Sequence, residues 1–146
     1  MYRILVAVDG SDHAGKVINE ALHIAEALKA EVTVLTAVGE YVYSSRAQVH
    51  FSDDNWELIN RQLEAEAEEL VEKAALPFRE KGLTVKKQVV IGLRSPSDVI
   101  CDTAAKGDFN MVILGSRGLR GIKEAFLGSV SNKVAHSVDI NVLIVK

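Results

Sequence analysis

Glycines and a serine in the last third of the chain are the residues whose spacing most clearly indicates binding chemistry. Gly115 and Gly118 follow a short apolar run, and Gly128-Ser129 then opens a segment with helical spacing. Glycine lets backbone approach a ligand closely, and a helix N-terminus offers unpaired N–H groups and positive dipole charge. The pattern favours a phosphate-binding loop, to which Arg117 and Arg120 could add positive charge, although surface arginines usually have no specific role. A loop whose glycines only turn the chain is the alternative.

An acidic residue follows the first apolar run of the chain. Residues 3–8 have the composition of a strand, and Asp9-Gly10-Ser11 comes directly after them. The carboxylate of Asp9 can accept hydrogen bonds from a ribose or from an adenine amino group. It can instead cap the helix that follows, a role for which Ser11 and Asp12 are also suitable.

Alternation of apolar runs with helical patterns predicts the fold class. Runs with little polar alternation cover residues 3–8, 31–38, 85–91, 111–114 and 141–145, as is typical of strands buried on both faces. One helix is expected to begin at Ser95-Pro96, with Asp98 in its first turn. Another carries the apolar stripe Trp56, Ile59, Leu63, Ala67, Leu70, Ala74 and Phe78, with Asp54 and Glu57 as a capping pair.

The order of these elements predicts an α/β fold, with an open five-stranded parallel sheet and helices on both faces. The elements use up residues 1–146, so we expect a single domain. Ligands of such sheets bind beyond the carboxyl ends of the strands, where the strand order reverses. The remaining stretch, residues 39–52, is either a functional lid or a mobile connection.

Composition excludes several classes of function. The chain has 146 residues, 48% of them apolar and 25% charged, with a net charge of −3, so neither nucleic acid nor membrane is expected as a partner. No signal-peptide pattern and no long apolar run are visible, which favours the cytoplasm. The lone Cys101 is expected to be half-buried on a helix, and His13 to be exposed. No P-loop, HExxH or GxSxG motif occurs, so we expect no catalytic residue and no metal ligand.

Three segments resemble the universal stress protein (UspA-like) family. They are the opening ILVAVDGS, the segment VILGSRGLRGIKEAFLGSVSNKVAHS and the closing NVLIVK. The second segment is similar to the nucleotide-binding signature of the ATP-binding branch of that family. The resemblance covers essentially the whole chain.

The resemblance implies a Rossmann-like sheet of order 3-2-1-4-5, which binds ATP, alone or with Mg²⁺, and dimerises through the last strand. It implies that Asp9 contacts ribose or adenine, that Ala37 lies by the adenine, and that Leu114 borders the nucleoside. The expected site comprises Ala7, Val8, Asp9, Ala37, Leu114, Gly115, Arg117, Gly118, Gly128, Ser129, Val130 and Ser131. The expected function is an ATP-binding signalling module in the stress response. A slow ATPase or a nucleotide-dependent transferase that uses the same site is the alternative.

Overall fold

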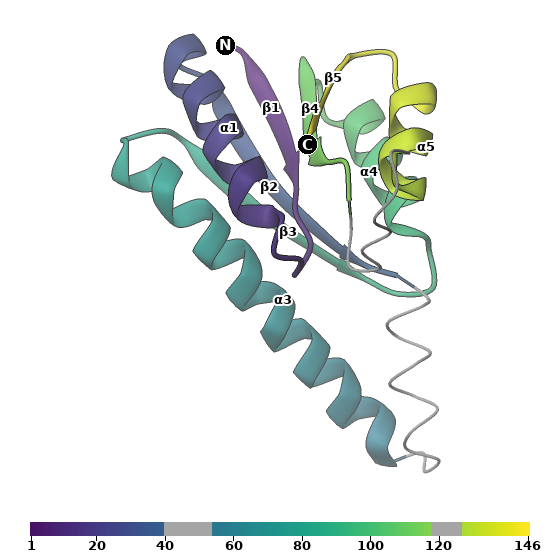
Figure 1. The fold of residues 1–146 in the computed structure, drawn as a ribbon. Coiled ribbons are helices and arrows are strands. Elements are labelled where there is room, and N and C mark those ends of the chain that lie inside the picture. The colour runs from purple at the N-terminus through teal and green to yellow at the C-terminus, as the bar shows by residue number, and fades with distance from the viewer. Residues whose placement is uncertain (40–53, 118–126) are drawn as a thin grey trace.

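Strands and helices alternate along the chain, as expected (Figure 1). The computed structural model describes residues 1–39, 54–117 and 127–146, with the backbone alone for 54–56. The strands are β1 (Arg3–Ala7), β2 (Glu31–Val38), β3 (Val85–Ile91), β4 (Met111–Gly115) and β5 (Asn141–Val145). The helices are α1 (Ala14–Leu28), α3 (Asp54–Glu80), α4 (Pro96–Lys106) and α5 (Ser129–Ser137). The strand bounds predicted from the apolar runs are confirmed to within one residue.

The sheet is parallel throughout, in the order β3-β2-β1-β4-β5. Both the predicted open sheet and the order implied by the resemblance are therefore confirmed. In the registers, Val6 of β1 pairs with Val34 of β2 and with Ile113 of β4. Because β2 lies on one side of β1 and β4 on the other, the strand order reverses between β1 and β4. The carboxyl ends of these two strands therefore form the switch point at which a ligand is expected.

Helices cover both faces of the sheet, with α1 and α3 on one face and α4 and α5 on the other (Figure 1). Apolar side chains of each strand alternate between the two layers, so that the strands are buried on both sides. The layer under α1 and α3 contains Ile4, Val6, Val32, Val34, Ala21, Ala25, Val71 and Phe78. The layer under α4 and α5 contains Leu5, Leu35, Val99, Ile100, Val112, Leu114 and Val134.

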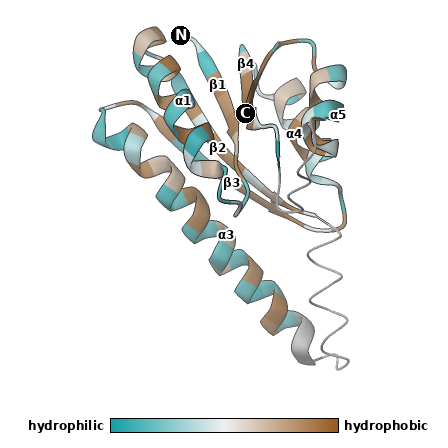
Figure 2. Cartoon of the chain, in the orientation of Figure 1, coloured by the Kyte–Doolittle hydropathy of each residue, from teal (hydrophilic) through white to brown (hydrophobic). Residues whose placement is uncertain are grey.

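The long helix α3 presents an apolar stripe to the sheet and a polar face to solvent (Figure 2). Five members of the predicted stripe are buried, namely Ile59, Leu63, Ala67, Ala74 and Phe78. Of these, Ala74 and Phe78 belong to the core between α3 and the sheet, and the half-buried Leu70 packs against it. The side chains of Asp54 and Trp56 lie outside the described residues. The second half of the stripe holds α3 against the sheet, and the outer face of the helix carries the exposed residues Glu64, Glu66, Glu68 and Glu69.

The start of α1 differs from the prediction. The helix begins at Ala14, and its N-cap is His13, which makes no capping hydrogen bond with its side chain. The carboxylate of Asp9 accepts a hydrogen bond from the N–H of Ser11 at 3.1 Å, and the Ser11 carbonyl accepts one from Ala14 at 3.1 Å. These bonds form a turn that places Ser11 and Asp12 before the helix rather than at its cap. The expectation that one of them caps α1 is therefore wrong, and Asp9 does not cap it either.

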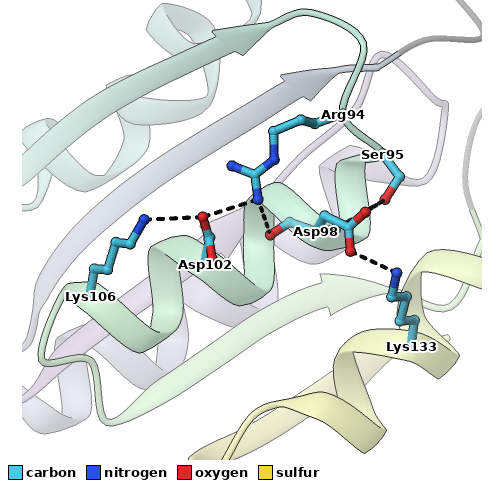
Figure 3. A network of polar contacts seen from close by, with 6 residues as sticks. All are labelled: Arg94, Ser95, Asp98, Asp102, Lys106 and Lys133. Carbon is cyan, nitrogen blue, oxygen red and sulfur yellow. Dashed lines mark hydrogen bonds and ion pairs between the residues drawn. The ribbon is translucent and has the colours of Figure 1, made fainter.

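The start of α4 follows the prediction and belongs to a polar network (Figure 3). The Ser95 hydroxyl accepts a hydrogen bond from the Asp98 N–H at 3.2 Å and donates one to the Asp98 carboxylate at 2.6 Å. The other carboxylate oxygen of Asp98 binds Lys133 of α5 at 2.7 Å. Asp102 binds both Arg94, at 3.0 Å, and Lys106, at 3.1 Å. The Asp98–Lys133 pair links α4 to the middle of α5.

We expect the melting temperature to fall between pH 5 and pH 2.5, because several carboxyl groups bind protons less tightly in the folded chain. Hydrogen bonds from Lys133 and Ser95 lower the pKa of Asp98, and those from Arg79 and Lys87 lower the pKa of Glu72 to about 2. Stabilisation from a lowered carboxyl pKa is complete above the unfolded pKa of about 4. It is lost as the pH falls through the folded value.

The control for this pH dependence uses two glutamates of the same helix. Glu72→Gln should flatten the fall in melting temperature between pH 4 and pH 2.5, measured by circular dichroism. Glu68→Gln removes an exposed carboxylate from the same helix and should leave the slope unchanged. A Glu72→Gln slope as steep as that of the parent protein would contradict the assignment.

Candidate functional site

The carboxyl ends of β1 and β2 are joined beyond the last strand residue of β1. The N–H of Val8 donates to the Leu35 carbonyl at 2.9 Å, and the hydroxyl of Thr36 donates to the Val8 carbonyl at 2.9 Å. Since Ala7 pairs with Leu35, the next residues of both strands continue side by side. Four residues expected from the sequence therefore lie together at this edge: Ala7, Val8, Asp9 and Ala37.

The end of β4 is fastened to the start of α5. The Ser116 carbonyl accepts a hydrogen bond from the N–H of Gly128 at 2.9 Å, and the N–H of Ser116 donates to the Val145 carbonyl at 2.7 Å. The first bond brings Gly128 close to Gly115 although they are far apart in the sequence, and the second continues the pairing of β4 with β5. The sequence pattern did not single out Ser116, which is buried and whose only signal was its place directly after Gly115. Gly118, expected to belong to the same loop, lies outside the described residues.

The N-terminus of α5 carries backbone donors that no described side chain caps. Gly128 occupies the N-cap and makes no side-chain capping bond, and Asn132 is the first residue whose N–H bonds back along the helix, to Gly128 at 2.9 Å. By helix geometry, the N–H groups of Ser129, Val130 and Ser131 have no partner within the helix. Three such donors at the positive end of a helix dipole fit a phosphate group.

The hydroxyl of Ser131 turns away from the free end of α5. Its side chain is only 1% exposed, and it donates to the Gly128 carbonyl at 3.0 Å. The residue therefore fixes the geometry of the first turn rather than offering its hydroxyl to a ligand. Ser129, by contrast, is exposed at the first helical position.

Glycine is required at position 115 for a packing reason as well. A Cβ atom placed there would lie 2.9 Å from Cδ2 of His13 and 3.2 Å from the Arg117 carbonyl oxygen. At Gly128 the corresponding atom would lie 3.1 Å from the Ser116 carbonyl oxygen. The first distance is shorter than carbon atoms normally approach, so close contact with the residue before α1 explains Gly115 without a ligand. The structural interpretation of this glycine is thus supported, and its role in ligand binding stays a prediction.

His13 is half-buried at this edge of the sheet, so the expectation that it would be exposed is wrong. Its Nε2 atom lies 2.8 Å from the Val145 carbonyl oxygen, which also accepts the Ser116 N–H. His13 thereby ties the start of α1 to the end of β5. The partners are 132 residues apart in the sequence, and no local pattern could have indicated the contact.

The other expected residues differ in how accessible they are. Leu114 is 3% exposed and packs into the core under α4 and α5, and Val130 packs against the same cluster. Asp9 is half-buried and Arg117 is exposed. Cys101 is half-buried on α4, as expected, and burial raises the pKa of its thiol.

Neither a metal-binding cluster nor a membrane-spanning helix occurs in the described part of the chain. Within residues 1–39, 54–117 and 127–146, no group of three or more His, Cys, Asp and Glu side chains is arranged to hold a metal ion. Over the same ranges, no helix has both the length and the apolar character needed to span a membrane.

Bacterial relatives match this chain over nearly its whole length. Universal stress protein YxiE of Bacillus subtilis is 32% identical over 151 aligned positions, which cover 99% of this chain and 98% of the relative. Universal stress protein Sll1388 of Synechocystis is 33% identical, and the match covers 99% of this chain and 97% of the relative.

Solved structures share the fold. The structure of the hypothetical protein MJ0577 is 27% identical, with a TM-score of 0.78 over 99% of this chain and 95% of that one. A universal stress protein from Archaeoglobus fulgidus in complex with dAMP is 24% identical, with a TM-score of 0.69 over 100% and 98%. A family protein from Arabidopsis thaliana with AMP bound is 18% identical, with a TM-score of 0.70 over 100% and 92%.

A family model describes the same group of proteins. The model of the universal stress protein family matches residues 1–146. The predicted resemblance is confirmed by this match and by the relatives. The chain therefore belongs to the universal stress protein family.

Proposed function

We propose that this chain binds ATP, alone or with Mg²⁺, at the carboxyl ends of β1, β2 and β4. The observation that carries the proposal is the N-terminus of α5, which no described side chain caps and which Ser116 holds against the end of β4. Solved relatives of the same fold contain dAMP and AMP, which supports an adenine nucleotide as the ligand.

The proposed site divides into a phosphate side and a nucleoside side. On the phosphate side, the N–H groups of Ser129 and Val130 donate to phosphate oxygens, the Ser129 hydroxyl adds a donor, and exposed Arg117 adds charge. Gly115 and Gly128 allow close approach, as does Gly118 in the part of the chain that is not described. On the nucleoside side, Asp9 faces the ribose or adenine, and backbone at Ala7, Val8, Ala37 and Leu114 lines the edge.

The proposed role is that of a nucleotide-dependent binding and signalling module in the stress response. The candidate site offers donors for phosphates, but its described residues do not form a nucleophile and general-base pair. The edge strand β5 pairs with β4 on one side only, which leaves its other edge for a second copy of the chain. We infer that the functional unit is a dimer joined at this strand.

Asp9→Asn should weaken ATP binding roughly tenfold, because it removes a charged acceptor from the nucleoside side. One carboxylate oxygen of Asp9 accepts the Ser11 N–H at 3.1 Å. An asparagine oxygen can keep that bond, while its amide nitrogen replaces the second acceptor with a donor. The turn should therefore survive, and only the bond to the nucleotide should be lost. Titration of ATP into each protein by calorimetry measures the effect.

The control for this titration is Asp12→Asn, an equal charge change at an exposed residue three positions away. Its affinity should match that of the parent protein. Equal ATP affinities for the parent protein and Asp9→Asn would show that Asp9 does not contribute to ATP binding. Phosphate release measured in the same samples tests the role: steady turnover that Ser129→Ala abolishes would show an ATPase instead of a binding module.

A further inference from the structure

An open groove lies on the sheet face that carries α4, between this helix and the edge strand β3. Its volume is about 610 Å³, within the range of roughly 300–1,000 Å³ that small-molecule sites occupy. Val90, Val99 and Phe109 supply its apolar surface. The groove shares no lining residue with the proposed nucleotide site, so the two sites do not overlap.

A threonine hydroxyl is accessible from this groove. Thr33 of β2 is only 6% exposed and lines the groove, yet no described residue hydrogen-bonds its side chain. Because this hydroxyl is accessible at the groove surface, a bound molecule can form a hydrogen bond with it. The amide of Gln88 and the hydroxyl of Thr103 line the same groove. A ligand that accepts hydrogen bonds would satisfy these groups.

Positive charge exceeds negative charge along the groove. Arg3, Lys86, Arg94 and Lys106 line it, and two carboxylates pair with all four. The following distances define the pairs: Asp102 lies 3.0 Å from Arg94 and 3.1 Å from Lys106, while Glu31 lies 2.6 Å from Lys86 and 3.9 Å from Arg3. Each carboxylate is thus shared by two cations, so the four cations and two carboxylates have a net charge of +2.

The cations approach the groove from opposite walls. Arg94 and Lys106 reach Asp102 from the two ends of α4 (Figure 3). Lys86 stands on β3, and Arg3 stands on β1 with its guanidinium 5.3 Å from the centre of the Phe109 ring. A fifth cation, Lys87, is held by Glu72 of α3 at 2.7 Å. Since α3 covers the other face of the sheet, the Lys87 ammonium is directed away from the groove.

We propose that this groove binds a small organic anion with an apolar body. The acidic groups of the ligand would lie between Lys86 and Lys106, where they would share the cations that Glu31 and Asp102 only half-neutralise. Its apolar body would lie on Val90, Val99 and Phe109. Its acceptors would satisfy the hydroxyl of Thr33. Positive charge, apolar surface and an accessible hydroxyl meet here in one open groove, and this combination of groups is typical of small-molecule sites.

The test is a titration of the full-length chain with pyranine, a pyrene trisulfonate, followed by amide NMR with and without excess ATP. We expect the largest shifts at Thr33, Gln88 and Thr103, unchanged by ATP. The double variant Lys86→Gln/Lys106→Gln should raise the dissociation constant at least about tenfold, because it removes two charge-assisted contacts. Thr33→Val should weaken pyranine binding. Thr33→Ser keeps the hydroxyl and should bind pyranine as tightly as the parent protein.

A charge-matched variant makes the test specific. Lys16→Gln/Lys29→Gln removes two exposed lysines from the α1 side and should leave pyranine affinity unchanged. An equal loss in both double variants, displacement of pyranine by ATP, or no binding to the parent protein would overturn the proposal. If inorganic pyrophosphate bound as tightly as pyranine, the ligand would not need an apolar body, and that part of the proposal would be overturned.

Discussion

Replacement of Ser129 by proline is expected to weaken ATP binding roughly 10- to 100-fold beyond the effect of Ser129→Ala. Proline is well tolerated at the first position of a helix, because the N–H it removes has no partner within the helix. The residue before it, Gly128, has φ −58° and ψ 157°, a conformation that proline allows in its predecessor. The helix should therefore form, while one backbone donor to the phosphates is lost.

The pair of variants separates the backbone donor from the hydroxyl. Ser129→Ala removes only the hydroxyl, so the difference between the two variants reports the N–H group. Circular dichroism and thermal unfolding should show that both variants fold like the parent protein. Equal ATP affinities for the proline and alanine variants would mean that the N-terminus of α5 does not hold the phosphates through this donor.

Phe78→Ala should lower the free energy of unfolding by about 3–5 kcal/mol, the largest effect on stability that we expect of a single truncation. The Phe78 side chain is 0% exposed in the layer between α3 and the sheet. The substitution loses the free energy gained by transferring a large aromatic side chain from water into the core. It also leaves a cavity that the close-packed neighbours fill only in part. Denaturant unfolding followed by circular dichroism measures the difference.

A leucine on the same helix provides the control for this truncation. Leu76 is 49% exposed, and Leu76→Ala should cost less than about 1 kcal/mol. Equal losses for the two variants would show that α3 does not pack on the sheet through the stripe that contains Phe78.

Much of the fold could be predicted because its signals are local. Strands covered on both faces need nearly continuous apolar runs, and the bounds of β2, β3 and β5 match those runs residue for residue. The N-cap of α4 could be predicted for the same reason, because Ser95, Pro96 and Asp98 lie within a single turn. These features depend on neighbouring residues, so the order of residue types was sufficient.

The features that could not be predicted depend on contacts between distant segments. His13 was expected to be exposed, but it is half-buried, and its ring contacts the Val145 carbonyl near the other end of the chain. Ser11 was expected to cap α1, but Asp9 binds its N–H and the helix starts later. The groove beside α4 combines residues of β1, β2, β3 and α4, and no motif marks it. Such sites arise from tertiary packing and leave no periodic pattern in the sequence.

Amide NMR of the full-length chain during titration with ATP is the measurement that tests the central claim most directly. We predict saturable binding, with the largest shifts at Ser129, Val130 and Asp9 and with small shifts at the groove residues Thr33 and Thr103. Absence of binding, or shifts that leave the start of α5 unchanged, would contradict the account.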